Sequence, residues 1–378
     1  MLYRQERGTP KERGIRLLKD GHTCKGMAFT LYERWYFGIH GLLPPAFMTE
    51  DQQSYRVIIN LRQSDDLARY MQLDCFQDRD EKLFYRVICD HVKELLPIVC
   101  TPTVGLACQK FGFIYRRPKG LYVTINDNSV SKIYHILSNW PETDVRVIVV
   151  TDGERVLGLG DLSCYGIGIP VGKLSLRRAG WRTTKKVLTD CVRRIDPFYI
   201  GLRRKRTRGE EYYHFVDNFM KACTKKFGQN LLIQFEDFAR QNAYHLLERY
   251  RSQYCVFNDG IQGTASVTLA GLLACGKHTE RLLSAKKISS LALDPLVSLL
   301  LPITLIQQLK LITFLRWQDV SAMKNLAALY PRPTNMENFM RSQTYQTTYI
   351  DMIDYTYNWP KDNMVQGYPV PYDHEYED

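Results

Sequence analysis

Three carboxylates follow two apolar runs that are expected to form strands. Glu236 and Asp237 come directly after residues 231–235, and Asp259 comes shortly after residues 254–257. Carboxylate oxygens are the ligands that Mg²⁺ and Mn²⁺ prefer in proteins. If the two strands are parallel, their carboxyl ends meet at one edge of a sheet, and the residue types and spacing predict a hard-cation site there. The alternative is that Glu236 and Asp237 only cap the following helix, whose dipole favours negative charge.

The segment between the two runs has the spacing of a helix with one buried face. Its apolar residues are Ala239, Ala243, Leu246, Leu247 and Tyr250. This stripe is typical of an amphipathic helix. A connection of this length can return the chain so that the second strand lies parallel to the first. We therefore expect strand, helix and strand, with the carboxylates at the edge where open α/β sheets bind ligands.

A second candidate for chemistry is Lys173, which follows a glycine-rich stretch, GIGIPVG, at 166–172. A phosphate-binding P-loop is excluded, because three residues rather than four separate Gly168 from Gly172, and Leu174 rather than Ser or Thr follows the lysine. A lysine at such a place is usually a solvated charge. Partial desolvation by the glycine-lined backbone would instead favour its neutral amine, which is a general base.

Length and composition indicate a globular protein of two or three domains. The chain has 378 residues, of which 24% are charged and 45% hydrophobic. The apolar stretch 288–309 is interrupted by Asp294, Pro295 and Pro302, so we expect no membrane-spanning helix. The ten cysteines stand singly, without a C-x-x-C pair. That pattern favours a reducing compartment and argues against a disulfide framework or a structural zinc site.

The net charge of +11 is partly clustered, at 177–178, 193–194 and 202–208. Basic runs can contact nucleic acid, but more often they are solvated loops, and no aromatic RNA-binding signature accompanies these. We expect neither nucleic acid nor membrane as a partner. Residues 1–20 exclude a secretory address and leave a mitochondrial one unsupported but open, so we expect a cytoplasmic protein.

The amino-terminal region has mainly helical patterns. Thr30 and Glu33 form a capping-box pattern, and spacing is helical from 52 to about 96. Residues 79–95 are expected to form one amphipathic helix that Pro97 ends. Residues 97–105 are then expected to form a short strand that runs into a loop.

That last stretch carries a family resemblance. Residues 97–105, PIVCTPTVG, together with 40–45 and 78–87, resemble the malic enzymes, in which the motif normally reads PIVYTPTVG. Residues 151–161, TDGERVLGLGD, and 166–174, GIGIPVGKL, look almost unaltered from that family. The resemblance implies an α/β fold: a helical amino-terminal region, an α/β substrate domain and a Rossmann-like NAD(P)-binding domain.

By this resemblance, which covers roughly 13–176 and 196–275, the reaction is oxidation of (S)-malate followed by decarboxylation to pyruvate and CO₂. It implies NAD or NADP and Mg²⁺ or Mn²⁺ as cofactors. Lys173 would take the proton of the substrate hydroxyl as hydride leaves for the nicotinamide. Arg155 would hold a substrate carboxylate by charge-assisted hydrogen bonds.

The resemblance also implies a metal on Glu236 and Asp237, with Asp259 beside them. A Lewis acid there polarises the ketone, so that loss of CO₂ leaves a stabilised enolate. A tyrosine in the place of Cys100 would protonate that enolate. The Cys100 thiol also carries a proton but lacks the ring that would bring it to the substrate.

Three further departures from the family pattern point to an impaired member, or pseudoenzyme. The family's paired aspartates become Asp259 and Gly260, and glycine offers no ligand for the expected third position. Residues 177–194 bear no likeness to the family. After Cys275 no G-x-G-x-x-G or G-x-G-x-x-A occurs, and likeness resumes only near Asn325. The intervening 277–324 is too short for a dinucleotide-binding domain, which needs about 100–150 residues.

Residues 288–297 suggest how that domain was lost. Joining the third base of each codon to the first two of the next permits IFIGAGSAG, which resembles a Rossmann fingerprint. A shifted reading frame is therefore a hypothesis for this segment. Beyond it, residues 326–333, 339–345 and 354–360 look like the malic enzyme carboxyl terminus, which packs back beside the substrate domain.

We expect an arm at 1–20, a substrate domain at 21–259, a truncated NAD(P)-binding remnant at 260–324 and a carboxyl-terminal segment at 325–378. The expected function is that of a malic-enzyme-like protein acting on malate and pyruvate, impaired or inactive in oxidation. The main alternative is a non-catalytic subunit that forms a homo-oligomer, or a hetero-oligomer with an intact relative. A basic nucleic-acid binder is the third possibility.

Overall fold

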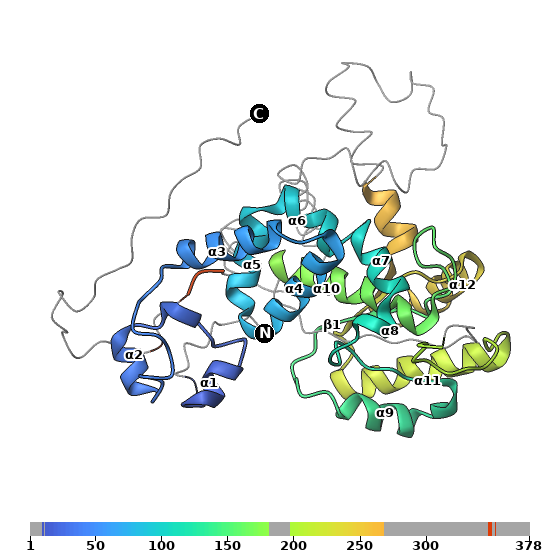
Figure 1. The fold of residues 1–378 in the computed structure, drawn as a ribbon. Coiled ribbons are helices and arrows are strands. Elements are labelled where there is room, and N and C mark those ends of the chain that lie inside the picture. Colours follow the sequence, from blue (N-terminus) through green and yellow to red (C-terminus); the bar gives the residue numbers. More distant parts are fainter. Residues whose placement is uncertain (1–9, 11, 181–196, 268–346, 350–351, 353–378) are drawn as a thin grey trace, which may run out of the picture. The chain divides into compact units, whose positions relative to one another are not determined.

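The computed structural model describes residues 10, 12–180, 197–267, 347–349 and 352 (Figure 1). The chain divides into two compact units, Met1–Val104 with Tyr345–Asp378, and Gly105–Thr344. The domain boundaries expected from the sequence stay a prediction, and most of the expected remnant at 260–324 lies outside the described residues, as does the shifted-frame stretch. No helix in the described ranges is long and apolar enough to cross a membrane.

The first unit is built from short helices. They are α1 (Ile15–Lys19), η1 (Gly26–Ala28), α2 (Leu31–Tyr36), α3 (Glu50–Arg62), α4 (Asp66–Arg79), α5 (Glu81–Asp90) and α6 (Val92–Val99). The predicted capping box is confirmed, because the Thr30 hydroxyl accepts from the Glu33 backbone N–H and the Glu33 carboxylate accepts from the Thr30 backbone N–H. Each bond satisfies a donor that the first helical turn leaves open.

Two sequence expectations for this unit are wrong. The helix expected at 79–95 is two helices that meet at His91, and Pro97 lies inside α6 rather than ending a helix. The strand expected at 97–105 is not formed, because α6 continues to Val99 and α7 (Thr103–Gln109) follows. Leu95, Ile98 and Val99 are buried at helical spacing, and this packing outweighs the hydrogen bond that proline removes.

The described carboxyl-terminal residues dock on the helices of the first unit. Tyr349 donates its hydroxyl to Asp80 Oδ2 at 2.5 Å and its backbone N–H to Glu50 Oε1 at 2.6 Å. The Met352 backbone N–H donates to Glu33 Oε1 at 3.2 Å, and that same oxygen accepts from Lys25 Nζ at 2.6 Å. This short segment is therefore part of the first unit.

The second unit contains a parallel sheet. Its strands are β1 (Val147–Val150), β2 (Leu232–Phe235) and β3 (Val256–Asn258). Its helices are α8 (Phe111–Ile114), η2 (Ile125–Asp127), α9 (Val130–Ser138), η3 (Ser163–Ile167), α10 (Gly168–Gly180), α11 (Glu210–Phe227), α12 (Arg240–Tyr250) and the π-helical turn η4 (Asp259–Gly263). The predicted α/β class and the predicted strand, helix and strand at 231–259 are confirmed.

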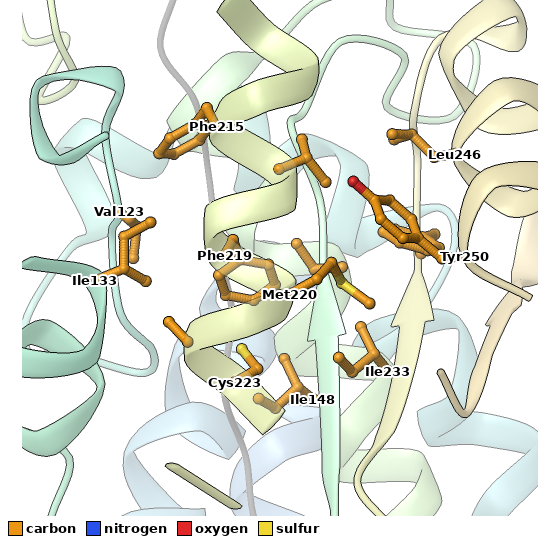
Figure 2. Close-up of a cluster of buried hydrophobic side chains, with 14 of the residues drawn as sticks. Val123, Ile133, Ile148, Phe215, Phe219, Met220, Cys223, Ile233, Leu246 and Tyr250 are labelled. Atoms are coloured by element: carbon orange, nitrogen blue, oxygen red, sulfur yellow. The ribbon is translucent and has the colours of Figure 1, made fainter. Parts of the chain in front are cut away.

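In the part of the chain that is described, the strand order is β1, β2, β3, with both pairs parallel. Ile148, Ile233 and Phe235 belong to the larger core on one face, and helices α9, α11 and α12 supply most of the other residues of that core. Figure 2 shows Phe215, Phe219, Met220 and Cys223 projecting from α11 between Ile133 on one side and Ile148 and Ile233 on the other.

The opposite face of the sheet has a smaller core. Val147 and Val149 of β1 pack with Leu232 of β2 and with Val171 and Leu174 of α10. Parallel sheets bury both faces in this way, which explains why β1 is buried at every position. Because α10 lies on this second face, its Lys173 is carried toward the sheet.

Candidate functional site

The three predicted carboxylates follow strands of the same parallel sheet. Glu236 and Asp237 come directly after β2, and Asp259 comes directly after β3. Lys173 joins them from α10, with Nζ 2.5 Å from Asp259 Oδ2 and 3.5 Å from Glu236 Oε1. Residues from three separate segments of the sequence are therefore brought together at the carboxyl edge of the sheet.

The alternative that Glu236 and Asp237 cap the next helix does not match the structure. Helix α12 begins at Arg240, and its N-cap, Ala239, makes no side-chain capping bond. Asp237 instead has a φ of 56°, a left-handed conformation that costs on the order of 1–3 kcal/mol in a non-glycine residue. Its backbone carbonyl accepts from the Arg155 N–H at 3.2 Å. The turn after β2 is thereby joined to the loop that carries Arg155.

Burial governs the protonation of these carboxyls. It raises the pKa of Glu236 well above its usual value, opposed by the charge of Lys173 and reinforced by those of Asp259 and Asp237. Burial also raises the pKa of Asp237 to about 7. Desolvation disfavours the charged form of a carboxyl group, and like charges nearby add to the effect. Such a cluster needs a cation if all its members are to be ionised together.

The donor set fits a hard divalent cation. Asp237 Oδ2 is buried without a hydrogen-bond partner in the described part of the chain, and it is an oxygen of the kind that Mg²⁺ and Mn²⁺ bind. No three His, Cys, Asp or Glu side chains among the described residues form a ready-made metal cluster. The Lys173 ammonium lies between Glu236 and Asp259, so a divalent ion here would compete with that ammonium for Asp259.

Gly260, which the sequence resemblance places where the malic enzymes are expected to have an aspartate, has room for a side chain. A Cβ built there would meet only Asn258 Oδ1, at 3.5 Å, an ordinary van der Waals contact. Its φ is not among the left-handed values of the described glycines. The backbone therefore tolerates an aspartate at this position.

Arg155 is exposed, on the loop between β1 and η3. Arg206 donates through Nη2 to the Asp152 carbonyl and to Asp161 Oδ1, both at 2.9 Å. Arg208 pairs with Glu154, which also accepts from Asn242. The arginines of the basic run thus hold the loop that carries Arg155.

The sequence interpretation missed these contacts. Arg204, Arg206 and Arg208 recur at every second residue, and side chains at that spacing share one side of an extended segment. This spacing predicts that the three arginine side chains lie on one side of the segment, but it does not identify their acidic partners. Arg204 contacts Asn126 and Thr207 instead of a carboxylate.

Cys100 belongs to the first compact unit, where it is the C-cap residue of α6. Its backbone N–H donates to the Leu96 carbonyl at 2.9 Å, and its side chain is half-buried with a free thiol. Its place as the position of the family's acid tyrosine stays a prediction from the family resemblance.

Comparison with known proteins gives one consistent result. The family model for the malic enzyme N-terminal domain matches residues 77–251. An NAD-dependent malic enzyme, mitochondrial, from Ascaris suum is 66% identical over 76% of this chain and 46% of its own length. An NADP-dependent malic enzyme from Anas platyrhynchos is 53% identical over 72% of this chain and 50% of its own length.

A solved malic enzyme structure from Entamoeba histolytica is 27% identical, covers 50% of this chain and 32% of its own, and superposes with a TM-score of 0.29. The chain spans about half the length of the curated relatives it matches. The matched region contains Lys173, Glu236 and Asp237, which the structure brings to one sheet edge beside Asp259. On the family model and the two relatives from Ascaris suum and Anas platyrhynchos, the chain belongs to the malic enzyme family.

Proposed function

We propose that the second unit holds the substrate and metal residues of a malic enzyme active site, and that oxidation of malate is impaired in this chain. The observation that carries the proposal is the convergence of Lys173, Glu236 and Asp259 at the carboxyl edge of the parallel sheet. The family reaction converts (S)-malate to pyruvate and CO₂ with NAD or NADP, and relatives of both dependences match the chain.

In this proposal, Lys173 is the base that removes the hydroxyl proton of malate. Its ion pair with Asp259 orients the ammonium toward the carboxylate cluster. Arg155 binds a carboxylate of the substrate, and its backbone bond to Asp237 keeps its loop beside that cluster. Glu236, Asp237 and Asp259 would hold Mg²⁺ or Mn²⁺, which supplies Lewis acidity toward the ketone during decarboxylation.

Impairment follows from residues that depart from the family pattern. Cys100 stands in the place of the acid tyrosine, and Gly260 in the place of the expected third metal ligand. The sequence after Cys275 has no dinucleotide fingerprint, so it contains no motif of the kind that binds a nicotinamide cofactor. Orientation of two reactants alone is worth about 7–11 kcal/mol of barrier.

The two half-reactions can be measured separately in one preparation. With Mn²⁺, malate and NAD or NADP, we expect NAD(P)H formation far below the usual enzymatic range of about 1–10³ s⁻¹. With Mn²⁺ and oxaloacetate, we expect weak decarboxylation that Lys173→Met abolishes. NAD(P)H formation within the usual range would contradict the proposed impairment.

The second candidate is a non-catalytic subunit, which the combination of Cys100 and Gly260 favours over an active enzyme. Such a subunit would associate with itself or with an intact relative through the family's interface. Size-exclusion chromatography with and without an intact malic enzyme tests this function. A complex of this chain with the intact enzyme is expected if the chain is such a subunit. A cytoplasmic location stays our prediction, although the relative from Ascaris suum is named mitochondrial.

A further inference from the structure

Gln234 is a buried polar side chain that the proposed roles leave without a function. It lies in the central strand β2, fully buried, with Val149 opposite it in β1 and Phe257 opposite it in β3. Val149 and Leu232, which lie on its face of the sheet, belong to the smaller apolar core. An apolar residue would be expected at such a position.

The amide of Gln234 makes one short hydrogen bond. Its Nε2 donates to Glu236 Oε2 at 2.6 Å, two residues further along the same chain. Its Oε1 is buried without a hydrogen-bond partner in the described part of the chain. A buried polar atom left in that state costs about 1–3 kcal/mol. If position 234 served only to pack the core, an apolar side chain would fill it without this cost.

The bond divides the two oxygens of the Glu236 carboxylate between different neighbours. Oε2 is held by the amide of Gln234, and Oε1 lies 3.5 Å from the Lys173 ammonium. The amide is a neutral donor, so it fixes the plane of the carboxylate without neutralising its charge. Oε1 is thereby directed toward the sheet edge at which Asp237 and Asp259 follow β2 and β3. This edge is where the proposed divalent cation would bind.

We propose that Gln234 is a positioning residue that holds Glu236 in the orientation needed to bind a divalent cation. The inference rests on the proposed function, because it requires that Glu236 is a ligand. Residues that hydrogen-bond to metal ligands commonly change metal affinity by about 10–100-fold when they are replaced.

The test is a titration of the full chain with Mn²⁺ alone, followed by electron paramagnetic resonance. The signal of free Mn²⁺ gives the dissociation constant, and the line shape of bound Mn²⁺ reports the symmetry of its ligands. Gln234→Met removes the amide at nearly constant volume, so folding should be retained, as circular dichroism will verify. Gln77→Met is the matched control, because Gln77 is also buried and donates Nε2, at 3.0 Å, to Tyr85 in the other unit.

We expect Gln234→Met to weaken Mn²⁺ binding at least about 10-fold and to alter the bound spectrum, whereas Gln77→Met leaves both unchanged. Gln234→Leu, a second apolar replacement, should act in the same direction. Unchanged affinity and spectrum in folded Gln234 variants, while Glu236→Gln abolishes binding, would overturn this inference and leave the proposed function standing. Absence of Mn²⁺ binding by the unmodified chain would overturn the proposed metal site and, with it, the role of Gln234.

Discussion

Lys173 and Asp259 lie 86 positions apart in the sequence and form an ion pair of 2.5 Å between Nζ and Oδ2. The pair joins α10 to the end of β3 and brings the proposed base to the proposed metal ligands. The Lys173 ammonium and a divalent ion would therefore compete for Asp259 Oδ2, because this oxygen cannot bind both cations at full strength. Metal binding and the state of Lys173 are therefore coupled.

Replacement of Lys173 should separate metal binding from proton transfer. In Lys173→Met, the carboxylates lose the cation that competes for Asp259, so Mn²⁺ should bind at least as tightly as to the unmodified chain. Oxaloacetate decarboxylation should be lost, since the enolate left by the departure of CO₂ needs a proton and the Lys173 ammonium is gone as its source. Electron paramagnetic resonance and an oxaloacetate assay measure the two effects. A tenfold weaker Mn²⁺ affinity would mean that Lys173 supports the site instead of competing for it.

Restoring the two family residues should recover one half-reaction. The double variant Cys100→Tyr, Gly260→Asp is expected to decarboxylate oxaloacetate in a metal-dependent way, because that step needs no hydride acceptor. Gly260 has space for the added side chain. Malate oxidation should stay absent, and following NAD(P)H separately measures it. Decarboxylation no faster than in the unmodified chain would show that the two substitutions are not the limiting defects.

The contribution of Asp80 to the stability of the first unit should decrease as the pH rises toward 6. Burial raises the pKa of Asp80 from 3.8 to about 6, opposed by hydrogen bonds from Tyr349 and Leu83. The folded state therefore holds this proton more tightly than the unfolded state. Its stabilising contribution is full below pH 3.8 and is lost as the pH rises through about 6, with a total on the order of 3 kcal/mol.

Urea unfolding of the chain and of Asp80→Asn, at pH values between 4 and 7, isolates this contribution. The asparagine Oδ1 can still accept from the Leu83 N–H and its Nδ2 can donate to the Tyr349 hydroxyl, but the amide does not titrate. We expect the stability of the unmodified chain relative to Asp80→Asn to fall between pH 4 and 6 and to level off above. A difference that does not change with pH would show that Asp80 titrates normally.

Arg206 should be important for the stability of the loop that carries Arg155. Its side chain is 5% exposed and it lies 3.8 Å from Asp152 Oδ2, a carboxylate that is 4% exposed. Arg206→Met leaves that buried charge without its partner, so the free energy of unfolding should fall by about 3–5 kcal/mol. Calorimetry or urea unfolding measures the loss.

A matched control is Arg146→Met, since Arg146 and its partner Asp144 are 42% and 62% exposed. Such an exposed pair contributes about 0–1 kcal/mol. Equal losses in the two variants would contradict a special role for Arg206 in holding the loop.

Periodicity was sufficient to predict the strand, helix and strand that position Glu236, Asp237 and Asp259. It failed around Pro97, because tertiary packing of Leu95, Ile98 and Val99 keeps α6 helical through the proline. Local patterns also could not pair residues distant in the chain. The ion pair of Lys173 and the hold of Arg206 on the Asp152 loop depend on how helices and loops meet the sheet.

The shifted-frame hypothesis for residues 288–297 concerns the gene and can be tested there. We expect the transcript to contain, in an alternative frame, codons compatible with IFIGAGSAG. A transcript in which no frame encodes such a peptide would dispose of the hypothesis.

The most direct test of the central claim, that this sheet edge binds a divalent cation, is Mn²⁺ titration of the unmodified chain and of Glu236→Gln. Asp217→Asn is the control, because Asp217 is a carboxylate of the same unit that accepts hydrogen bonds from Arg249 and Tyr250, neither of which is a residue of the proposed site. We predict one Mn²⁺ site that Glu236→Gln abolishes and Asp217→Asn preserves. Equal Mn²⁺ affinity in the unmodified chain and in Glu236→Gln, or no binding to either, would contradict the claim.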